Sequence, residues 1–300
     1  MPLKKPAVSL VAVPGRRQAT IEFAREAERR GFSGVYCPSL AGDGLGLCLA
    51  VALSTTTLRV GTSIAPIYMR HAVDFAQTAS FIHEMSGGRF DFGIGVSHAP
   101  VHQRFGLSVG KPLADVRRFV EGLRAVPRIE LPPIVLATLR KRMVQLAGEI
   151  ADGVVWANGA RSHMEHSLSY LPDEKRASFF VGNMIPTCIS DDKAAAAALM
   201  RRTLTGYAML PNYQNYWIEA GYREEIAAIR KALAAGEQDK LPSLMSERWL
   251  SDVTLYGSAA EVREGVQAWY AAGVKTPILV PTSAQGGQMQ ALQELLAAFD

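Results

Sequence analysis

Short apolar segments alternate with amphipathic segments along most of the 300-residue chain. Apolar runs bounded by Gly or Pro are typical of buried strands, whereas apolar residues spaced three and four apart are typical of helices. Eight strands are expected on this basis, at residues 7–13, 34–37, 58–64, 90–96, 134–137, 153–156, 179–189 and 277–280. An alternation of strand and helix repeated eight times predicts an α/β fold in which a parallel sheet closes into a (β/α)8 TIM barrel.

Helices are expected between these strands and at the end of the chain. Their ranges are 18–30, 45–54, 72–85, 112–125, 139–150 and 288–299, with a further helix that Asp191-Asp192 caps and that continues toward Met209. Residues 211–250 are expected to form a helical insertion between strands seven and eight. Because no low-complexity linker or strong repeat interrupts the sequence, residues 1–300 are expected to form a single domain.

Composition and charge exclude several classes of partner. The net charge of +4 is spread along the chain, and the short basic cluster Arg140-Lys141-Arg142 does not argue for nucleic acid. No apolar run approaches a membrane span, and the first residues lack a signal-peptide core. The three cysteines, Cys37, Cys48 and Cys188, have no metal-binding spacing and no disulfide framework. We expect a cytoplasmic protein that acts on a small molecule, without a nucleic-acid or membrane partner.

The stretch from Arg89 to His98 carries the strongest functional signal. An apolar strand runs into Gly93-x-Gly95, and a polar stretch, expected to be flexible, then holds His98, His102 and Arg104. Enzymes with parallel sheets place their chemistry at the carboxyl ends of the strands. The stretch therefore suggests a barrel enzyme with a flat, anionic cofactor.

Two other conspicuous motifs are expected to be structural. Ser86-Gly87-Gly88-Arg89 joins a helix to a strand, and Asp152-Gly153 likewise comes before a strand. In a (β/α)8 barrel such connections lie at the end opposite the active site. Both motifs are therefore predicted to be turns.

The helix expected after strand five begins with Thr138-Leu139-Arg140-Lys141. A helix amino terminus presents free N–H groups and the positive end of the helix dipole, which together suit a phosphate group. A basic helix start that is merely solvated is the alternative.

Several motifs in this order and spacing resemble the luciferase-like monooxygenase superfamily. They are Gly31-Phe-Ser-Gly-Val-Tyr36, Leu58-Arg-Val-Gly-Thr-Ser63, Arg70-His71, Ser86-Gly-Gly-Arg89 with Gly93-Ile-Gly95, and Leu146-Ala-Gly-Glu-Ile-Ala-Asp-Gly153. The resemblance covers residues 22–152 and resumes over residues 274–281. It implies a (β/α)8 barrel that binds FMN or the deazaflavin coenzyme F420. The segment Gly95-Val-Ser-His-Ala-Pro100 is similar to the deazaflavin-dependent branch.

The resemblance also implies roles for individual residues. It places a non-prolyl cis peptide at Ser63-Ile64, behind the cofactor ring, with an ordinary trans strand end as the alternative. The positions that it matches to the cofactor site are Ser39, Thr62, Ser63, Ile64, Gly95, Val96, Ser97, His98, Ala137, Thr138, Leu139 and Arg140. One departure is Ser39-Leu40, which stands where many relatives have an acidic residue followed by histidine. Another is the turn Ala137–Arg140, which lacks the glycine that is frequent in relatives.

His98 matches a position at which relatives carry a proton donor. An imidazole could give or take a proton as hydride moves to or from the substrate, or it could merely hydrogen-bond the cofactor or a loop carbonyl. His102 and Arg104 are expected to be exposed loop residues, with contact to a phosphorylated tail or a substrate as the alternative. His71 is expected to be a structural element at the start of a helix.

The resulting expectation is an F420-dependent oxidoreductase that transfers a hydride between C5 of the deazaflavin and a small organic substrate. The first alternative is an FMN-dependent luciferase-like monooxygenase, and the second is a flavin- or deazaflavin-binding protein without catalysis. The chain has no dinucleotide-binding fingerprint, because Gly93-x-Gly95 lacks the third glycine and the helix start that should follow. A metal hydrolase is disfavoured, since the histidines do not fall at the ends of several strands. The resemblance also implies a homodimer.

Overall fold

The computed structural model describes residues 4–39 and 42–300, so that Leu40 of the Ser39-Leu40 pair lies outside the described part. The fold is α/β, of the (β/α)8 TIM-barrel class, as expected. The chain divides into two compact units. The first unit comprises Met1–Trp156 and Ser169–Gly182, and the second comprises Ala157–Leu168 and Asn183–Asp300.

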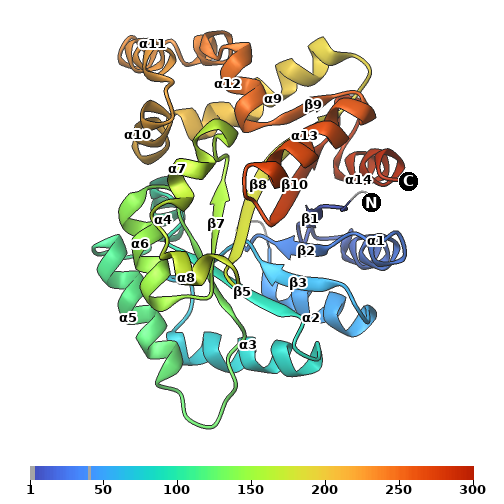
Figure 1. Ribbon diagram of the computed structural model, residues 1–300, viewed down its shortest axis with the longest axis vertical. Helices are drawn as coiled ribbons and strands as arrows, with labels where there is room; N and C mark the ends of the chain where they lie inside the picture. The colour runs from blue at the N-terminus through green and yellow to red at the C-terminus, as the bar shows by residue number, and fades with distance from the viewer. Residues whose placement is uncertain (1–3, 40–41) are drawn as a thin grey trace. The chain divides into compact units, whose positions relative to one another are not determined.

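The first unit holds a parallel sheet (Figure 1). Neighbouring strands pair in parallel in the order β1, β2, β3, β5, β6, β7, and the short β4 pairs with β5. The strands are β1 (Ala7–Ser9), β2 (Gly34–Cys37), β3 (Arg59–Thr62), β4 (Ala65–Pro66), β5 (Phe90–Gly95), β6 (Ile134–Ala137) and β7 (Gly153–Ala157). All six residues of β5 are buried, as expected of a strand covered on both faces.

Helices connect these strands. They are α1 (Arg17–Arg29), α2 (Gly44–Ser54), α3 (Ala72–Met85), α4 (Ala99–Phe105), α5 (Pro112–Arg124), α6 (Lys141–Ile150) and α8 (Asp173–Arg176). All of them except α4 and α8 bury residues against the rest of the unit. In α5, for example, Val116, Phe119, Val120 and Leu123 are buried, the i, i+3, i+4, i+7 pattern of an amphipathic helix.

The second unit contains the predicted helical insertion. Its strands are β8 (Phe180–Ile189, whose first residues belong to the first unit), β9 (Leu255–Gly257) and β10 (Thr276–Thr282). Between β8 and β10 lie the helices α9 (Lys193–Ala208), α10 (Pro211–Glu219), α11 (Arg223–Ala234), α12 (Glu247–Val253) and α13 (Ala259–Ala271), together with the 3-10 helix η2 (Gln238–Leu244). The unit also holds the 3-10 helix η1 (Arg161–His163) and the helices α7 (Met164–Leu168) and α14 (Gln288–Ala298). Sequence patterns did not predict β9, because three residues are too few to show a period.

Two elements near the end of β5 differ from expectation. The stretch predicted to be flexible is the helix α4, which has Pro100 in its first turn and ends at Gly106 in the left-handed conformation. No residue of α4 is buried, and a short helix without an apolar face gives no periodic signal. The strand expected over residues 58–64 ends at Thr62 as β3, and a second short strand, β4, begins at Ala65, after Ser63 and Ile64.

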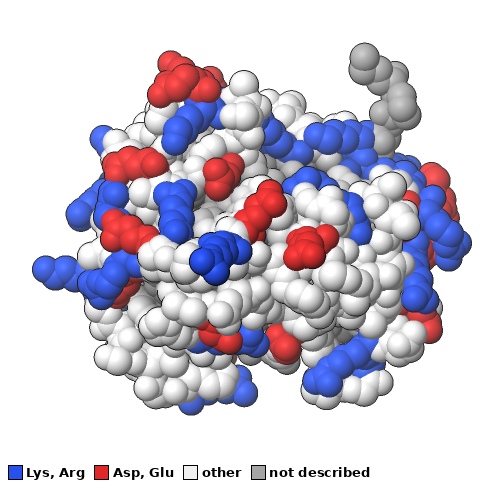
Figure 2. All heavy atoms as spheres, turned by 90° about the horizontal axis from the view of Figure 1, so that it is seen from below, with Lys and Arg blue, Asp and Glu red and all other residues white. Residues whose placement is uncertain are grey.

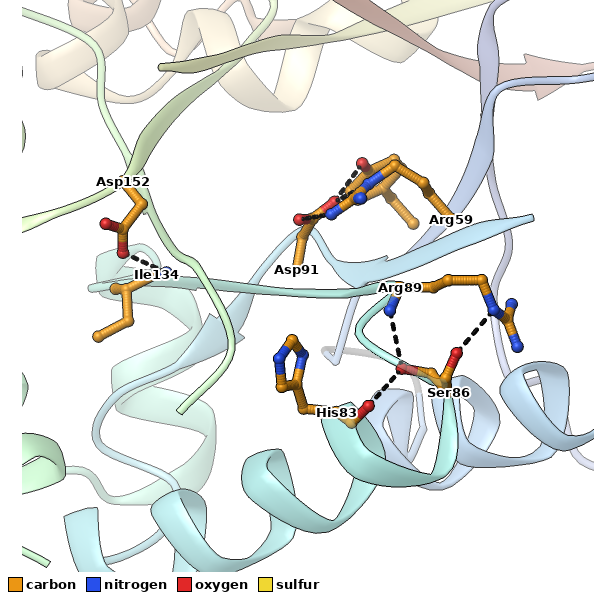
Figure 3. A network of polar contacts seen from close by, with 8 residues as sticks. Arg59, His83, Ser86, Arg89, Asp91, Ile134 and Asp152 are labelled. Carbon is orange, nitrogen blue, oxygen red and sulfur yellow. Dashed lines mark hydrogen bonds and ion pairs between the residues drawn. The ribbon is translucent and has the colours of Figure 1, made fainter. Parts of the chain in front are cut away.

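The turn Ser86-Gly87-Gly88-Arg89 is structural, as predicted. Ser86 Oγ donates to the carbonyl of His83 (2.8 Å) and accepts from the backbone N–H of Arg89 (3.1 Å), as Figure 3 shows. The Arg89 guanidinium donates to backbone carbonyls of Ser86, Ala52, Thr55 and Leu58. Two of these carbonyls, those of Ala52 and Thr55, lie at the carboxyl end of α2, where the helix itself offers them no partner.

The turn at Asp152 is structural as well. A carboxylate oxygen of Asp152 accepts from the backbone N–H of Ile134 at 2.9 Å, so the turn before β7 is joined to the start of β6 (Figure 3). His71, also predicted to be structural, is the N-cap of α3, and its ring accepts from the N–H of Val73 at 3.3 Å.

Glu28 joins α1 to the loop before β3, and its charge should matter for stability. One carboxylate oxygen accepts from the backbone N–H groups of Thr56, Thr57 and Leu58 at 2.6–2.9 Å. Burial opposes ionisation, but these N–H groups outweigh it and lower the pKa of Glu28. Glu28→Gln should reduce the free energy of unfolding by about 1 kcal/mol at pH 7, because neutral hydrogen bonds replace charge-assisted ones.

The pH dependence gives a sharper test of the same substitution. A carboxylate whose folded pKa is lowered stabilises the protein above its unfolded pKa of about 4.3, and this contribution disappears as the pH falls through the folded value. The difference between wild type and Glu28→Gln should therefore shrink between pH 5 and pH 3 in urea unfolding, whereas the exposed control Glu84→Gln should change little. A difference that stays constant with pH would contradict this role.

Charged side chains of both signs are interspersed on the face shown in Figure 2. This mixture agrees with the modest net charge, which arises from 32 basic and 28 acidic residues. Among the helices in the described part of the chain, none combines the length and the apolar character of a membrane span.

Candidate functional site

Four hydroxyl side chains lie at the carboxyl ends of four neighbouring strands of the first unit. Ser39 follows β2, Ser63 follows β3, Ser97 follows β5 and Thr138 follows β6. Since the carboxyl ends of parallel strands share one edge of a sheet, these residues belong to the edge where (β/α)8 enzymes bind ligands.

Backbone hydrogen bonds hold three of these residues in place. The N–H of Ser39 donates to the carbonyl of Ile64 (3.2 Å), and the N–H of Ser63 donates to the carbonyl of Cys37 (3.1 Å). The N–H of Thr138 donates to the carbonyl of Val155 at 2.9 Å. The ends of β2 and β3 are thus bonded to each other, and the end of β6 is bonded to β7.

The hydroxyl oxygens of these four residues are buried, and none has a hydrogen-bond partner within the described residues. Ser63 and Thr138 are only 3% and 6% exposed. A buried hydroxyl without a partner costs about 1–3 kcal/mol, so native proteins keep few of them. Four at adjacent strand ends form a set that the polar atoms of a ligand could satisfy.

Thr62 differs from its neighbours because its hydroxyl is already satisfied. Thr62 Oγ1 donates to the carbonyl of Gly93 at 2.7 Å, which ties β3 to β5. A methyl group added at Gly93 would lie 1.9 Å from the carbonyl oxygen of Thr62. One added at Gly95 would lie 2.7 Å from Cβ of Ala137. Glycines therefore keep β5 close to both neighbouring strands, and Thr62 contributes to this packing.

The peptide bond between Ser63 and Ile64 is cis, which confirms the geometry that the resemblance implied. The carbonyl of Ile64 accepts from Ser39, and the Ile64 side chain lies beside Gly95, 3.3 Å from the position of a methyl group added there. The structure thus brings Ser39, Ile64 and Gly95 together; their contact with a cofactor stays a prediction.

His98 lies at the start of α4, where it is the N-cap residue, and it is partly buried. It follows Ser97, whose φ of 62° lies in the left-handed region that favours glycine. Burial lowers the pKa of His98, and the nearby His102 lowers it further. His98 is therefore held as a neutral imidazole at neutral pH, a state that can accept a proton at one ring nitrogen and donate one from the other.

His102 is not the exposed loop residue that was expected. It lies on α4 and is partly buried, with Nε2 at 2.5 Å from the carbonyl oxygen of Val96. Its ring meets the ring of Tyr68 edge-on, with centroids 5.5 Å apart. The helix causes the difference, because it folds residue 102 back over the end of β5. Arg104 is exposed, as expected, and its guanidinium lies 5.3 Å over the ring of Phe105.

The segment after β6 leads into a helix with a basic amino terminus, as predicted, but the helix starts later than expected. Arg140 is the exposed N-cap residue of α6, which begins at Lys141 instead of residue 139. The carbonyl of Leu139 accepts from Trp156 Nε1 at 3.3 Å and so holds the turn against β7. The role of this turn in binding phosphate stays a prediction.

Sequence patterns missed the residues that support His102. Tyr68 OH donates to Asp115 at 2.8 Å, and Asp115 also accepts from the backbone N–H of Gly110. The contact between Tyr68 and Asp115 joins residues far apart in the sequence, so no local pattern predicts it. Among the described residues, no group of three His, Cys, Asp or Glu side chains is placed to hold a metal ion.

Parallel strands with unpartnered hydroxyls and a partly buried imidazole at their carboxyl ends define a (β/α)8 protein suited to a polar ligand. The family model for luciferase-like monooxygenases matches residues 5–276, and the chain belongs to this family. It is therefore a member of a family of flavin- and deazaflavin-dependent oxidoreductases.

Known proteins resemble the chain over most of its length. A Mycobacterium tuberculosis protein named "Putative coenzyme F420-dependent oxidoreductase" is 26% identical over 317 aligned residues, which cover 88% of this chain and 91% of the relative. The structure of F420-dependent tetrahydromethanopterin reductase from Methanopyrus kandleri superposes with a TM-score of 0.78 at 16% identity, over 99% of this chain and 98% of that one. An F420-dependent secondary alcohol dehydrogenase gives a TM-score of 0.72 at 14% identity over 100% of both chains. At these identities the two structures establish a common fold.

Proposed function

We propose that the protein is an F420-dependent oxidoreductase that transfers a hydride between C5 of the deazaflavin and a small organic substrate. The observation that carries the proposal is the set of buried, unpartnered hydroxyls of Ser39, Ser63, Ser97 and Thr138. The names of the Mycobacterium tuberculosis relative and of the two superposed enzymes point to the same cofactor.

The residues present fit such a cofactor. Hydroxyl groups donate and accept hydrogen bonds, so the four side chains can pair with the carbonyl and N–H groups of a heterocycle. The amino terminus of α6, with the exposed Arg140 beside it, suits the cofactor's phosphate. When bound, F420 supplies a two-electron carrier that gives or takes a hydride at C5.

His98 is the residue that we assign to proton transfer. Oxidation of an alcohol releases a proton as well as a hydride, and the reverse reaction consumes both. A neutral imidazole accepts the proton in the first direction, and its protonated form returns the proton in the second. The lowered pKa of His98 favours the accepting form at neutral pH.

Titration of the purified protein separately with F420 and with FMN tests the cofactor. Tryptophan fluorescence and the cofactor's absorbance spectrum report binding. Micromolar or tighter binding of F420 together with weak binding of FMN supports the proposal. The opposite preference would favour a flavin-dependent monooxygenase, and no binding of either cofactor would refute both functions.

Removing the unpartnered hydroxyls should weaken F420 binding without lowering the stability of the protein. Ser63→Ala and Thr138→Val should each leave the free energy of unfolding unchanged or raise it by up to about 1 kcal/mol, because a buried group without a partner disappears. Each should weaken F420 binding about 3- to 10-fold, since the ligand loses one hydrogen bond. Urea unfolding and the fluorescence titration measure the two effects.

The exposed Ser251 offers a matched control, because Ser251→Ala removes a hydroxyl that donates to the carbonyl of Arg248 in the second unit. This variant should bind F420 as the wild type does. Unchanged F420 affinity in both Ser63→Ala and Thr138→Val would remove the hydroxyl set from the site.

A further inference from the structure

The end of β5 turns sharply before α4 begins. Ser97 adopts a φ of 62°, which a residue with a side chain takes at a conformational cost. Contacts around the turn must offset this cost. The turn decides where His98 lies, because His98 is the next residue and the N-cap of α4.

His102 makes the side-chain contact that reaches back to this turn. The backbone N–H of His102 donates to the carbonyl of His98 at 3.1 Å, so one turn of helix separates the two residues. Its side chain then reaches the carbonyl oxygen of Val96, 2.5 Å from Nε2. The contact therefore closes a ring of chain from residue 96 to residue 102, with Ser97 and His98 inside it.

The chemistry of the contact fixes the state of the His102 ring. A backbone carbonyl oxygen only accepts hydrogen bonds, so Nε2 of His102 must carry the proton. A side chain with a donor at this point can replace the imidazole, whereas an aliphatic side chain of similar size cannot.

The His102 ring is itself held from two other elements. Tyr68, which follows β4, meets it edge-on at 85° between the ring planes. The Tyr68 hydroxyl donates to Asp115 in the first turn of α5, and Asp115 also accepts from Gly110 at 2.8 Å. The groups that surround the turn thus come from α4, from the segment after β4 and from α5, and they limit the motion of the imidazole.

We propose that His102 is the positioning residue of the site, which holds the Val96–His98 turn through the Val96 carbonyl and so places His98 and Ser97 toward the ligand. The functional significance of His102 rests on the proposed function, since His102 places the group that we assign to proton transfer. Its structural part, the hold on the turn, is independent of the cofactor.

The test compares variants that keep or lose the donor. His102→Gln retains an N–H group that can reach Val96, whereas His102→Leu has none and His102→Asn is too short. Gln103→Leu, at an exposed neighbouring position on α4, is the matched control. The first readout is the backbone amide spectrum of the protein without cofactor, in which the Ser97 nitrogen responds to hydrogen bonding at the Val96 carbonyl.

The second readout is the dissociation constant for F420. His102→Leu and His102→Asn should shift the Ser97 and His98 amide signals and weaken F420 binding about 3- to 10-fold. The dissociation constants of His102→Gln and Gln103→Leu should stay within about twofold of the wild-type value, because both variants keep a hydrogen bond to the Val96 carbonyl. Rescue by glutamine separates positioning from a general contribution of the ring to stability.

Three results would overturn the inference. The first is unchanged Ser97 and His98 signals in both His102→Leu and His102→Asn. The others are loss of stability alone with unchanged signals and affinity, and a glutamine variant as impaired as the leucine variant. If the wild type does not bind F420, the proposed function fails, while the amide spectra still decide whether His102 holds the turn.

Discussion

Replacing Arg59 with methionine should lower the free energy of unfolding by about 3–5 kcal/mol, because it leaves a buried carboxylate without its cation. Asp91, in β5, is 2% exposed. It accepts from Arg59 Nε at 3.0 Å, from a second guanidinium nitrogen, and from the hydroxyl of Tyr36 at 2.8 Å. Figure 3 shows Arg59 and Asp91 bonded to each other.

The geometry explains why the effect should be large. The Arg59 side chain is 44% exposed, so water reaches the cation, but the Asp91 side chain is 3% exposed and cannot be rehydrated. Burial, followed by the charge of Asp91, raises the pKa of Tyr36 well above its usual range. The phenol therefore stays a hydrogen-bond donor but brings no positive charge to replace the guanidinium.

A double variant and a surface pair make the test specific. Arg59→Met combined with Asp91→Asn should recover much of the lost stability, because the amide oxygen still accepts from Tyr36 and no charge remains buried. Glu149→Ala, which breaks the exposed pair with Arg117, should cost no more than about 1 kcal/mol. Urea unfolding measures all three, and an Arg59→Met loss as small as that of Glu149→Ala would contradict the argument.

Gly93→Ala should cost about 3 kcal/mol or more and disturb the site at the same time. The added methyl group would lie 1.9 Å from the carbonyl oxygen of Thr62, a backbone atom that no side-chain rotation can move away. β3 and β5 must separate, which also strains the bond from Thr62 Oγ1 to the Gly93 carbonyl. Overpacking at such a point reaches or exceeds the upper end of its usual cost.

A graded series of glycine variants tests this prediction. Gly95→Ala should be milder, because the nearest atom is the side-chain Cβ of Ala137 at 2.7 Å. Gly206→Ala, in the open interior of α9, should raise the free energy of unfolding by about 1 kcal/mol. Thermal and urea unfolding should rank the proteins, from most to least stable, as Gly206→Ala, wild type, Gly95→Ala and Gly93→Ala. A Gly93→Ala protein with wild-type unfolding midpoints would show that β3 and β5 can accommodate a methyl group, and it would contradict the prediction.

Local patterns predicted much of the fold. β2, β6 and α3 have the predicted bounds, since glycines, prolines or a change of period mark their ends. α4 escaped prediction because it lacks a buried face. The strand around Ser63 was predicted as one piece, because the sequence shows the apolar run but not where its pairing is interrupted.

The candidate site was predictable only in part. Ser63, Thr138 and His98 could be placed at strand ends by counting strands, and the family resemblance supplied their roles. Whether a hydroxyl is buried and unpartnered depends on side chains from other strands, which no local pattern reports. The contact between His102 and Val96 depends on the left-handed turn at Ser97, and serine gives little indication of that conformation.

The turn at Ser97 also bears on how such a sequence is selected. Glycine would adopt a φ of 62° freely, whereas serine pays about 1–2 kcal/mol for it. Alanine at position 63 and valine at position 138 would likewise relieve hydroxyls that lack partners. A sequence optimised for thermostability alone would differ at all three positions. The free protein is therefore less stable than its backbone allows, and a ligand that satisfies these oxygens should raise its melting temperature.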